Sequence, residues 1–373
     1  MTLRERILAV YRGEIPDRVP FMLDLSHWFF HKNRLPWDLT MPYGVPDYQL
    51  IEFHKKSGAG FYVPILAIGW SVEYPDDVSC EVRKETDGKT TFIVWRYTTP
   101  HGTICRRRVW EEISYSWPIL EWGVHNEQDL KILGYALSNR KFKPVFDDYR
   151  KWVEAVGDIG VVYMPFGYSA MGMLMNAWMG VSETILATYD METAVREFVD
   201  SVNENNLRLI DILCTSPAEV VMMGDNFSSD IQPPGFFDRW SKPFYKEAVR
   251  RLHAAGKLVA VHIDGRLRGA LAMIRETGAD CADAVTPAPM GDLTPVECRE
   301  EAGMHFILSG GIPPDVWSPD VSIERFEKSV RDWLDIRKFS PRLIAAAGDQ
   351  VPPGAEESRI YLMQDIVEKY GAY

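Results

Sequence analysis

The sequence of 373 residues lacks the features of several protein classes. Its five cysteines form no CxxC pair, and an odd count in a long chain without an export signal indicates a reducing compartment. It has no excess of basic residues: the formal net charge is -12, which argues against binding nucleic acid. No stretch approaches the ~20 apolar residues needed to cross a bilayer. The opening MTLRERILAVYRGE is charged and has too little apolar sequence for export. We therefore expect a cytoplasmic protein with no nucleic-acid or membrane partner.

The sequence also lacks the GxGxxG fingerprint of a dinucleotide-binding open sheet. Short apolar runs instead alternate with amphipathic segments, which is the pattern of parallel strands joined by helices. Eight strands are predicted, at residues 18–25, 60–68, 161–165, 220–223, 258–262, 281–284, 306–309 and 343–346. Eight strands favour a closed (β/α)8 TIM barrel over a doubly wound sheet, with residues 1–373 as a single domain.

One segment departs from this alternation. Residues 78–110 alternate polar and apolar side chains, with Asp87-Gly88 between two such runs and a second turn near Pro100–Gly102. An Asp-Gly pair between alternating runs is the strongest short-range signal of a β-hairpin. We predict an antiparallel β-meander inserted into the barrel.

The run KLVAVHIDG, residues 257–265, holds the strongest candidate for a functional site. Residues i and i+2 of a strand point to the same side, so His262 and Asp264 can converge where the strand ends. An imidazole beside a carboxylate suits a metal site or an acid–base pair, and packing alone is the structural alternative. Asp225 and Asp349 follow other predicted strands and can reach the same barrel mouth. Asp225 is a candidate ligand or base, or alternatively caps the segment after it.

Other residues are candidates for contact with a substrate. His27, Tyr168 and Met164 lie at or just after the ends of predicted strands, and packing or loop anchoring is their alternative role. His27 falls in an aromatic and histidine-rich segment, residues 27–31, predicted as a loop. The Met- and Trp-rich residues 171–179 either fill the core or line a pocket or docking face for a flat ligand.

These landmarks resemble a known family. The opening RERILAVYRGEIPDRVPF, the TPHGT turn, the block MPFGYSAMGMLMNAWMG, the strand ends GDNFSS and HIDG, and the tail GDQVPPGAEESRIYLMQDIVEKYG resemble the uroporphyrinogen decarboxylase superfamily. The resemblance spans nearly the whole chain and implies a TIM barrel. True decarboxylases carry an RQAGR-type motif after the first strand and an aspartate after the second. This chain has LDLSHWFFHKNR and VPILAIGW there, which argues against porphyrinogen decarboxylation.

The resemblance extends to the cobalamin-dependent methyltransferase branch of that superfamily. Its thiol-active members hold zinc with a His-x-Cys at the fifth strand and a further cysteine in a tail like GCDIPP. Here His262 stands at the histidine, and Asp264 and Asp349 stand at the two cysteines. The resemblance thus implies a site of one imidazole and two carboxylates, either holding Zn²⁺ or acting without metal as a proton-transfer couple.

The expected function is transfer of a methyl group from a small O-methylated compound, such as an aryl methyl ether, to the cobalt of a corrinoid protein. The chain has no corrinoid-binding DxHxxG segment, so the cobalamin would come from a separate partner. Two alternatives stay open. One is a lyase acting on a small carboxylated substrate, and the other is a non-catalytic tetrapyrrole- or corrinoid-binding protein.

Overall fold

The structure is a computed structural model that describes residues 1–35, 38–40, 44–62 and 68–373. Six parallel strands form one sheet in the order β12-β11-β10-β9-β8-β7. Their side chains are buried almost throughout, as in parallel sheets covered by helices. The strands are β7 (Met164–Gly167), β8 (Val220–Phe227), β9 (Leu258–Ile263), β10 (Cys281–Val285), β11 (Ile307–Ile312) and β12 (Leu343–Ala347).

Two segments near the amino terminus close this sheet into a barrel. The Met22 amide donates to the Ala345 carbonyl at 3.0 Å, and the Leu23 amide donates to the Gly60 carbonyl at the same distance. Phe61 in turn forms a parallel bridge to Gly160, just before β7. The two segments therefore occupy the positions predicted for the first two strands, and the (β/α)8 barrel is confirmed. Residues 63–67 of the second predicted strand lie outside the described residues.

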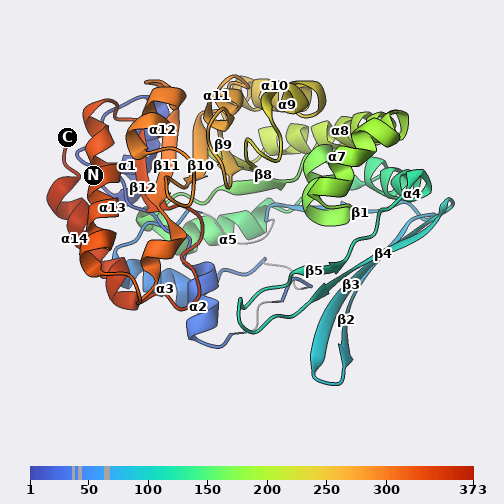
Figure 1. The fold of residues 1–373 in the computed structure, drawn as a ribbon, viewed down its shortest axis with the longest axis horizontal. Coiled ribbons are helices and arrows are strands. Elements are labelled where there is room, and N and C mark those ends of the chain that lie inside the picture. Colours follow the sequence, from blue (N-terminus) through green and yellow to red (C-terminus); the bar gives the residue numbers. More distant parts are fainter. Residues whose placement is uncertain (36–37, 41–43, 63–67) are drawn as a thin grey trace.

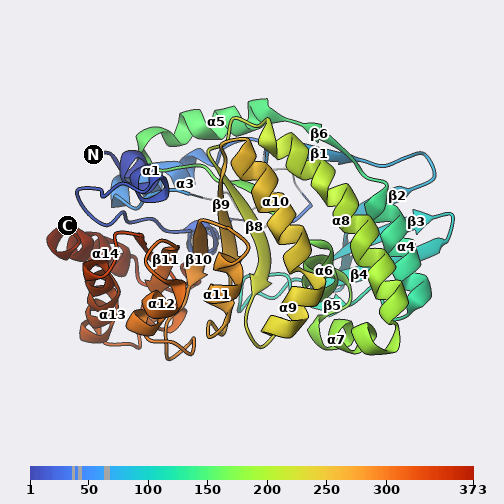
Figure 2. The same ribbon diagram turned by 90° about the horizontal axis from the view of Figure 1, so that it is seen from above.

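Helices cover the outside of the barrel, and Figure 2 shows α10 lying along β8 and β9, with α8 packed beside α10. The loop predicted at 27–31 is wrong: these residues form helix α2, because Trp28 and Phe29 pack into the barrel core. Within the described ranges, no helix has both the length and the apolarity of a membrane span. The main helices are α1 (Leu3–Arg12), α2 (Ser26–Lys32), α3 (Tyr48–Ser57), α4 (Glu127–Ser138), α5 (Phe146–Val156), α6 (Ala170–Met173), α7 (Val181–Asp190), α8 (Glu192–Cys214), α9 (Pro234–Trp240), α10 (Lys242–Ala254), α11 (Ala270–Arg275), α12 (Pro295–Ala302), α13 (Ile323–Asp335) and α14 (Glu357–Tyr370).

The barrel interior is apolar near α1 and polar toward the carboxyl ends of the strands. An apolar cluster joins α1 to inward side chains from several strands, among them Ala260, Cys281 and Ile307. Two residues further along three of these strands stand His262, Asp283 and Ser309. Since alternate residues of a strand share a face, these polar side chains form the next interior layer, toward the carboxyl ends of the strands.

The predicted antiparallel insertion is present and is larger than the predicted range 78–110. A four-stranded sheet, β2-β3-β4-β5, extends to one side of the barrel, at the lower right of Figure 1. Its hairpin turn falls on Gly88-Lys89, one residue later than predicted, because Asp87 pairs with Thr90. Helix α4 and a two-stranded sheet, β1-β6, belong to the same excursion. The strands are β1 (Trp70–Glu73), β2 (Ser79–Asp87), β3 (Thr90–Thr99), β4 (Gly102–Val109), β5 (Ile119–Glu121) and β6 (Lys141–Pro144).

Candidate metal site at the barrel mouth

His262 is the penultimate residue of β9, and a carboxylate of the neighbouring strand β10 contacts its ring on the side away from the mouth. Asp283 on β10 pairs in register with His262, and its Oδ2 lies 3.2 Å from Nδ1 of the imidazole. The hydroxyl of Ser309, on β11, donates to the other carboxylate oxygen at 3.2 Å. A carboxylate at Nδ1 fixes the proton on that nitrogen, so the Nε2 lone pair faces the barrel mouth.

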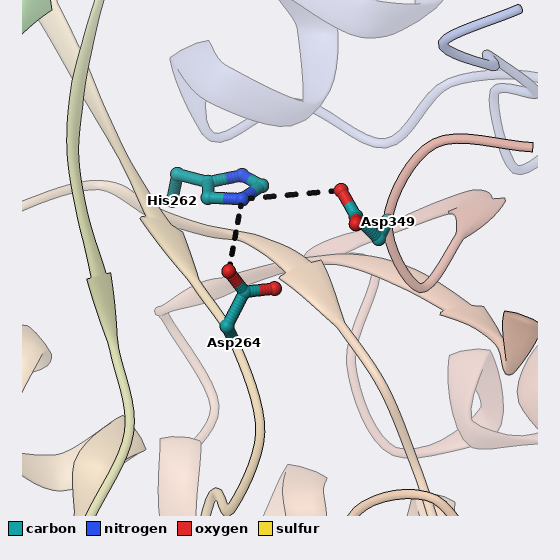
Figure 3. Close-up of side chains that lie close together, drawn as sticks. All are labelled: His262, Asp264 and Asp349. Atoms are coloured by element: carbon teal, nitrogen blue, oxygen red, sulfur yellow. Dashed lines mark ion pairs between the residues drawn. The ribbon is translucent and has the colours of Figure 1, made fainter. Parts of the chain in front are cut away.

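Two further carboxylates meet Nε2 of His262 there. The Oδ2 of Asp264 lies 3.7 Å from Nε2, and the Oδ1 of Asp349 lies 4.0 Å from it. Figure 3 shows the ring between the two acids, one from the end of its own strand and one from the loop after β12. The exposed fraction of the side chain is 23% for His262, 35% for Asp264 and 48% for Asp349. The predicted trio therefore lies together and opens toward solvent.

Hydrogen bonds from both backbone and side chains fix the loop that carries Asp349. Thr286 donates its hydroxyl proton to the Gly348 carbonyl at 2.5 Å, and the Val351 amide donates to the Asp24 carbonyl at 2.9 Å. A Cβ at Gly348 would lie 2.3 Å from Oγ1 of Thr286, so only glycine allows this close approach. The side-chain amide of Gln350 adds a bond to Oδ2 of Asp24 at 3.1 Å. The position of Asp349 is thus set by the first and sixth strand ends of the barrel.

The backbone is left-handed at one position on each side of β9. Asn226, in β8, has a φ of 51°, and Ala284, in β10, has a φ of 65°. Asparagine adopts this conformation more readily than other residues with a Cβ, whereas at Ala284 it costs about 1–2 kcal/mol. Ala284 directly follows Asp283, and the β10–β11 register shifts between Ala282 and Val285. Such strain persists where surrounding structure enforces it and clusters at functional sites.

The charges of the trio depend on one another. Burial alone would lower the pKa of His262, but Asp264 and Asp283 outweigh it and raise that pKa well above its ordinary value. Burial works against ionisation of Asp264 as well, yet His262 brings the pKa of this carboxyl below normal. For Asp349, burial prevails over the attraction of His262 and raises the pKa to about 6. Three acceptor groups that converge in this way need a proton or a cation between them.

The donor set fits a divalent metal ion. One ligand atom from each of His262, Asp264 and Asp349 lies within 4.8 Å of the other two. Ligands about 2.1 Å from a tetrahedral zinc ion are roughly 3.4 Å apart, close to the 3.7 and 4.0 Å separations from Nε2. One imidazole and two carboxylates leave a fourth position open, as in catalytic rather than structural zinc sites. The residues present therefore fit Zn²⁺ with small side-chain movements.

Asp225 does not join the trio. Its carboxylate is fully buried and accepts hydrogen bonds from the backbone amide of Ser169, at 2.7 Å, and from the Ser169 hydroxyl. Ser169 is the N-cap of α6, and burial raises the pKa of Asp225 to about 6. Asp225 therefore has a structural role, but it holds the segment after β7 and does not cap the segment that follows it in the chain.

The three predicted substrate contacts lie in different surroundings. Tyr168 is half-buried just after β7; burial raises the pKa of its hydroxyl, and the charges of Arg108 and His262 act to lower it. His27 is half-buried on α2, with Nε2 at 3.0 Å from the Ser114 carbonyl, so it ties the insertion to the barrel. Met164 is fully buried in the barrel core.

The Met- and Trp-rich segment does not form a docking face. Met171, Met175, Trp178 and Met179 are buried in a second core, between the insertion and α8, and Met173 is partly buried against them. The segment spans α6 and a π-helical turn, η2 (Leu174–Trp178). The core alternative for these residues is therefore the correct one.

The sequence places Asp283 at the carboxyl end of a predicted strand, but the sequence interpretation gave this residue no role in the site. It stands inside the apolar strand CADAV and is fully buried, so no motif marks it as functional. The feature that could have identified it is a carboxylate within a strand whose other residues are apolar and predicted to be buried. A buried carboxylate must be paired or hydrogen-bonded, and two strands were already predicted to end in polar residues beside it.

The fold and these polar strand ends define a TIM-barrel protein with a candidate metal site at its mouth. The sequence model for uroporphyrinogen decarboxylase matches residues 114–370, well over half of the chain. The chain belongs to the uroporphyrinogen decarboxylase family.

Two solved structures were compared with this fold. A methyltransferase from Methanosarcina mazei superposes with a TM-score of 0.64 at 14% identity, covering 99% of each chain. That likeness shows a shared fold. An octameric ribulose-1,5-bisphosphate carboxylase/oxygenase from Pyrococcus horikoshii OT3 gives a TM-score of 0.28 at 10% identity, covering 65% of this chain and 48% of its own, too low to support any argument. No curated protein matches the sequence.

Proposed function

We propose that the protein is a corrinoid-dependent methyltransferase. It would move a methyl group from a small O-methylated compound, such as an aryl methyl ether, to the cobalt of a separate corrinoid protein that docks at the barrel mouth. The observation that carries this proposal is the convergence of His262, Asp264 and Asp349 on one open position. The fold shared with a methyltransferase from Methanosarcina mazei is consistent with it.

The reaction makes a specific demand on the site. The bond between the methyl carbon and the ether oxygen breaks, its electron pair stays on the oxygen, and a new carbon–cobalt bond forms with electrons from Co(I). The protein must therefore place the methyl group and stabilise the charge that develops on oxygen. Zn²⁺, when bound by the trio, would supply the positive charge that this oxygen requires.

The surrounding residues prepare the trio for this task. Asp283 holds the His262 ring by its Nδ1 edge, so Nε2 points to the mouth. Asp264 and Asp349 present negative charge on either side of Nε2 and retain a cation there. Without a metal, a protonated His262 would instead give its Nε2 proton to the leaving oxygen. The mechanism with a bound metal and the mechanism with a protonated His262 both place the leaving oxygen next to Nε2 of His262.

A methyl-donor screen tests this function. Purified protein is incubated with free cob(I)alamin and a panel of methyl ethers, and methylcobalamin formation is followed by its absorbance. We expect turnover with at least one donor, and we expect His262→Ala to lower it by roughly 10²–10³-fold, the scale of losing one electrostatic stabiliser.

The matched control is His253→Ala. His253 also pairs with an aspartate, Asp280, at 2.9 Å, but belongs to α10 on the outside of the barrel. It should keep full activity. Absence of turnover across the panel, or equal activity of the two variants, contradicts the proposal.

A further inference from the structure

Two arginines on β4 lack the charged partner that such residues normally have. Arg106 and Arg108 are half-buried and lie on the same face of the strand, since they are two residues apart. Among the described residues, neither has a carboxylate within 4 Å, and no acidic residue occurs in the undescribed segments. Arg107, on the opposite face, pairs with Glu121 at 2.8 Å. The Nε atoms of Arg106 and Arg108 are buried and have no hydrogen-bond partner within the described part of the chain.

The face that carries these arginines adjoins the barrel mouth. Nη1 of Arg106 donates to the Ala177 carbonyl in η2 at 2.7 Å. Asn176, the preceding residue, donates to the Asp225 carbonyl of β8 at 2.9 Å. Since β8 pairs with β9, which carries His262, only a short series of contacts separates β4 from the trio.

Tyr168 directly follows β7, the strand whose end lies near His262. A Cβ at Gly224 would lie 4.0 Å both from the Gly167 carbonyl and from Cβ of His262, so the end of β7 and the histidine are close. Burial raises the pKa of the Tyr168 hydroxyl, while the charges of Arg108 and His262 both act to lower it. The hydroxyl is thus within electrostatic range of the arginine on one side and of the trio on the other.

The two arginines differ in how they are held. The Arg106 guanidinium stacks between the rings of Trp95, at 4.4 Å, and Trp178, at 4.9 Å, which stabilises its charge. Among the residues that the structure describes, Arg108 stacks on no ring; it donates from Nη1 to the Trp117 carbonyl at 2.9 Å. Burial lowers the pKa of Arg108, and burial together with the Arg108 charge lowers that of Arg106 to about 10. Two partly desolvated like charges are costly unless an anion joins them.

We propose that Arg108 and the Tyr168 hydroxyl form a carboxylate-binding subsite, with Arg106 reinforcing its positive charge, so that the methyl donor is an O-methylated carboxylic acid. This inference rests on the proposed function. The donor spans the mouth, with its ether oxygen at the trio and its carboxylate at β4. A guanidinium edge and one hydroxyl supply the number of donors that suits a planar carboxylate.

Binding of a matched pair of ligands tests the subsite without any corrinoid. 4-Methoxybenzoate and 4-methoxybenzamide have the same shape, but only the first is charged. Calorimetric titration of the wild type should show the acid binding roughly 10- to 100-fold more tightly than the amide, the scale of hydrogen bonds to a charged group. Equal binding of the two ligands would overturn the subsite.

Variants of neighbouring arginines complete the test. Arg108→Gln should remove the preference for the acid and leave amide binding unchanged, and Arg108→Lys should restore part of it. Arg107→Gln, on the opposite face of β4, is the matched control and should keep the preference. An equal loss in Arg108→Gln and Arg107→Gln contradicts the proposal. Circular dichroism confirms that each variant is folded.

Turnover with the same two ligands separates this inference from the proposed function. Selective binding of the acid through Arg108 without methyl transfer to cob(I)alamin would support the subsite and contradict the methyltransferase. Equal methyl transfer from acid and amide would support the methyltransferase and contradict the subsite.

Discussion

Asp283 never reaches the barrel mouth, yet the chemistry of the mouth depends on it. Its Oδ2 holds Nδ1 of His262 at 3.2 Å, and its side chain is only 2% exposed. The carboxylate thus decides which histidine nitrogen carries the proton and which can bind a metal ion. Residues that orient a metal ligand in this way tune affinity without touching the metal.

Replacing Asp283 with asparagine should weaken metal binding while the fold persists. The amide keeps the shape but removes the charge behind the imidazole, so we expect zinc affinity to fall by about 10- to 100-fold. Competition with a chromophoric chelator measures this. Asp238→Asn, an exposed substitution on α9, serves as the control. Unchanged affinity in Asp283→Asn would show that the His262 ring needs no support from this side.

A second histidine makes stability depend on pH. His54 is buried, with Nδ1 at 3.0 Å from the Ala59 carbonyl, and burial lowers its pKa to about 4. The unfolded chain takes up this proton near pH 6.5, so the contribution to stability is complete above that pH. It is lost as the pH falls toward 4, by roughly 3 kcal/mol in total.

His54→Gln should remove this part of the pH dependence. Glutamine can still donate to the Ala59 carbonyl but does not titrate. Urea unfolding at pH 7.5 and at pH 5 should show a smaller loss of stability in the variant than in the wild type. The same loss in both proteins would mean that His54 does not control the acid sensitivity.

Among the secondary-structure elements, buried strands were the most predictable. Runs such as LVAVHI and LIAAA are apolar on both faces, and parallel strands inside a helical layer read in this way. The structure places β9 and β12 within one residue of their predicted ends. Strands of the insertion were harder to predict, because β6 is only four residues long and KFKP is too short a run to signal a strand.

Helix α2 was missed for a different reason. Its sequence SHWFFHK is short and has no side-chain cap, so no local signal marks its start. Trp28 and Phe29 stabilise it by packing into the barrel core, and the Trp28 indole donates to the Ala355 carbonyl at 2.8 Å. Tertiary contacts of this kind decide the conformation of short segments and cannot be read locally.

The junction of β7 and α6 depends on the contact between Ser169 and Asp225. Ser169→Ala should cost about 2–3 kcal/mol, because it removes a helix cap and leaves a buried carboxylate without its hydroxyl donor. Chemical unfolding measures the loss, and zinc binding should be unchanged since Asp225 is outside the trio. Ser201→Ala, on α8, is the control and should be nearly neutral. Loss of zinc binding in Ser169→Ala would instead assign Asp225 to the metal site.

In the molecule as a whole, the barrel was predicted from the sequence pattern, and the trio from the family resemblance. The order of strands fixes which ends share a mouth, so residues as distant as His262 and Asp349 could be placed at the same end of the barrel. The contact between Asp283 and His262 and the arginine-bearing face of β4 could not be predicted from the sequence. They depend on strand register and on the contacts between the insertion and the barrel, neither of which follows from the local sequence.

Zinc titration of metal-stripped protein shows whether His262, Asp264 and Asp349 form a single cation site. We expect one zinc ion to bind per chain. We also expect at least about 100-fold weaker binding in His262→Ala and in Asp349→Asn, since each variant removes a ligand. Absence of stoichiometric binding, or binding as tight in these variants as in the wild type, would rule out the metal site.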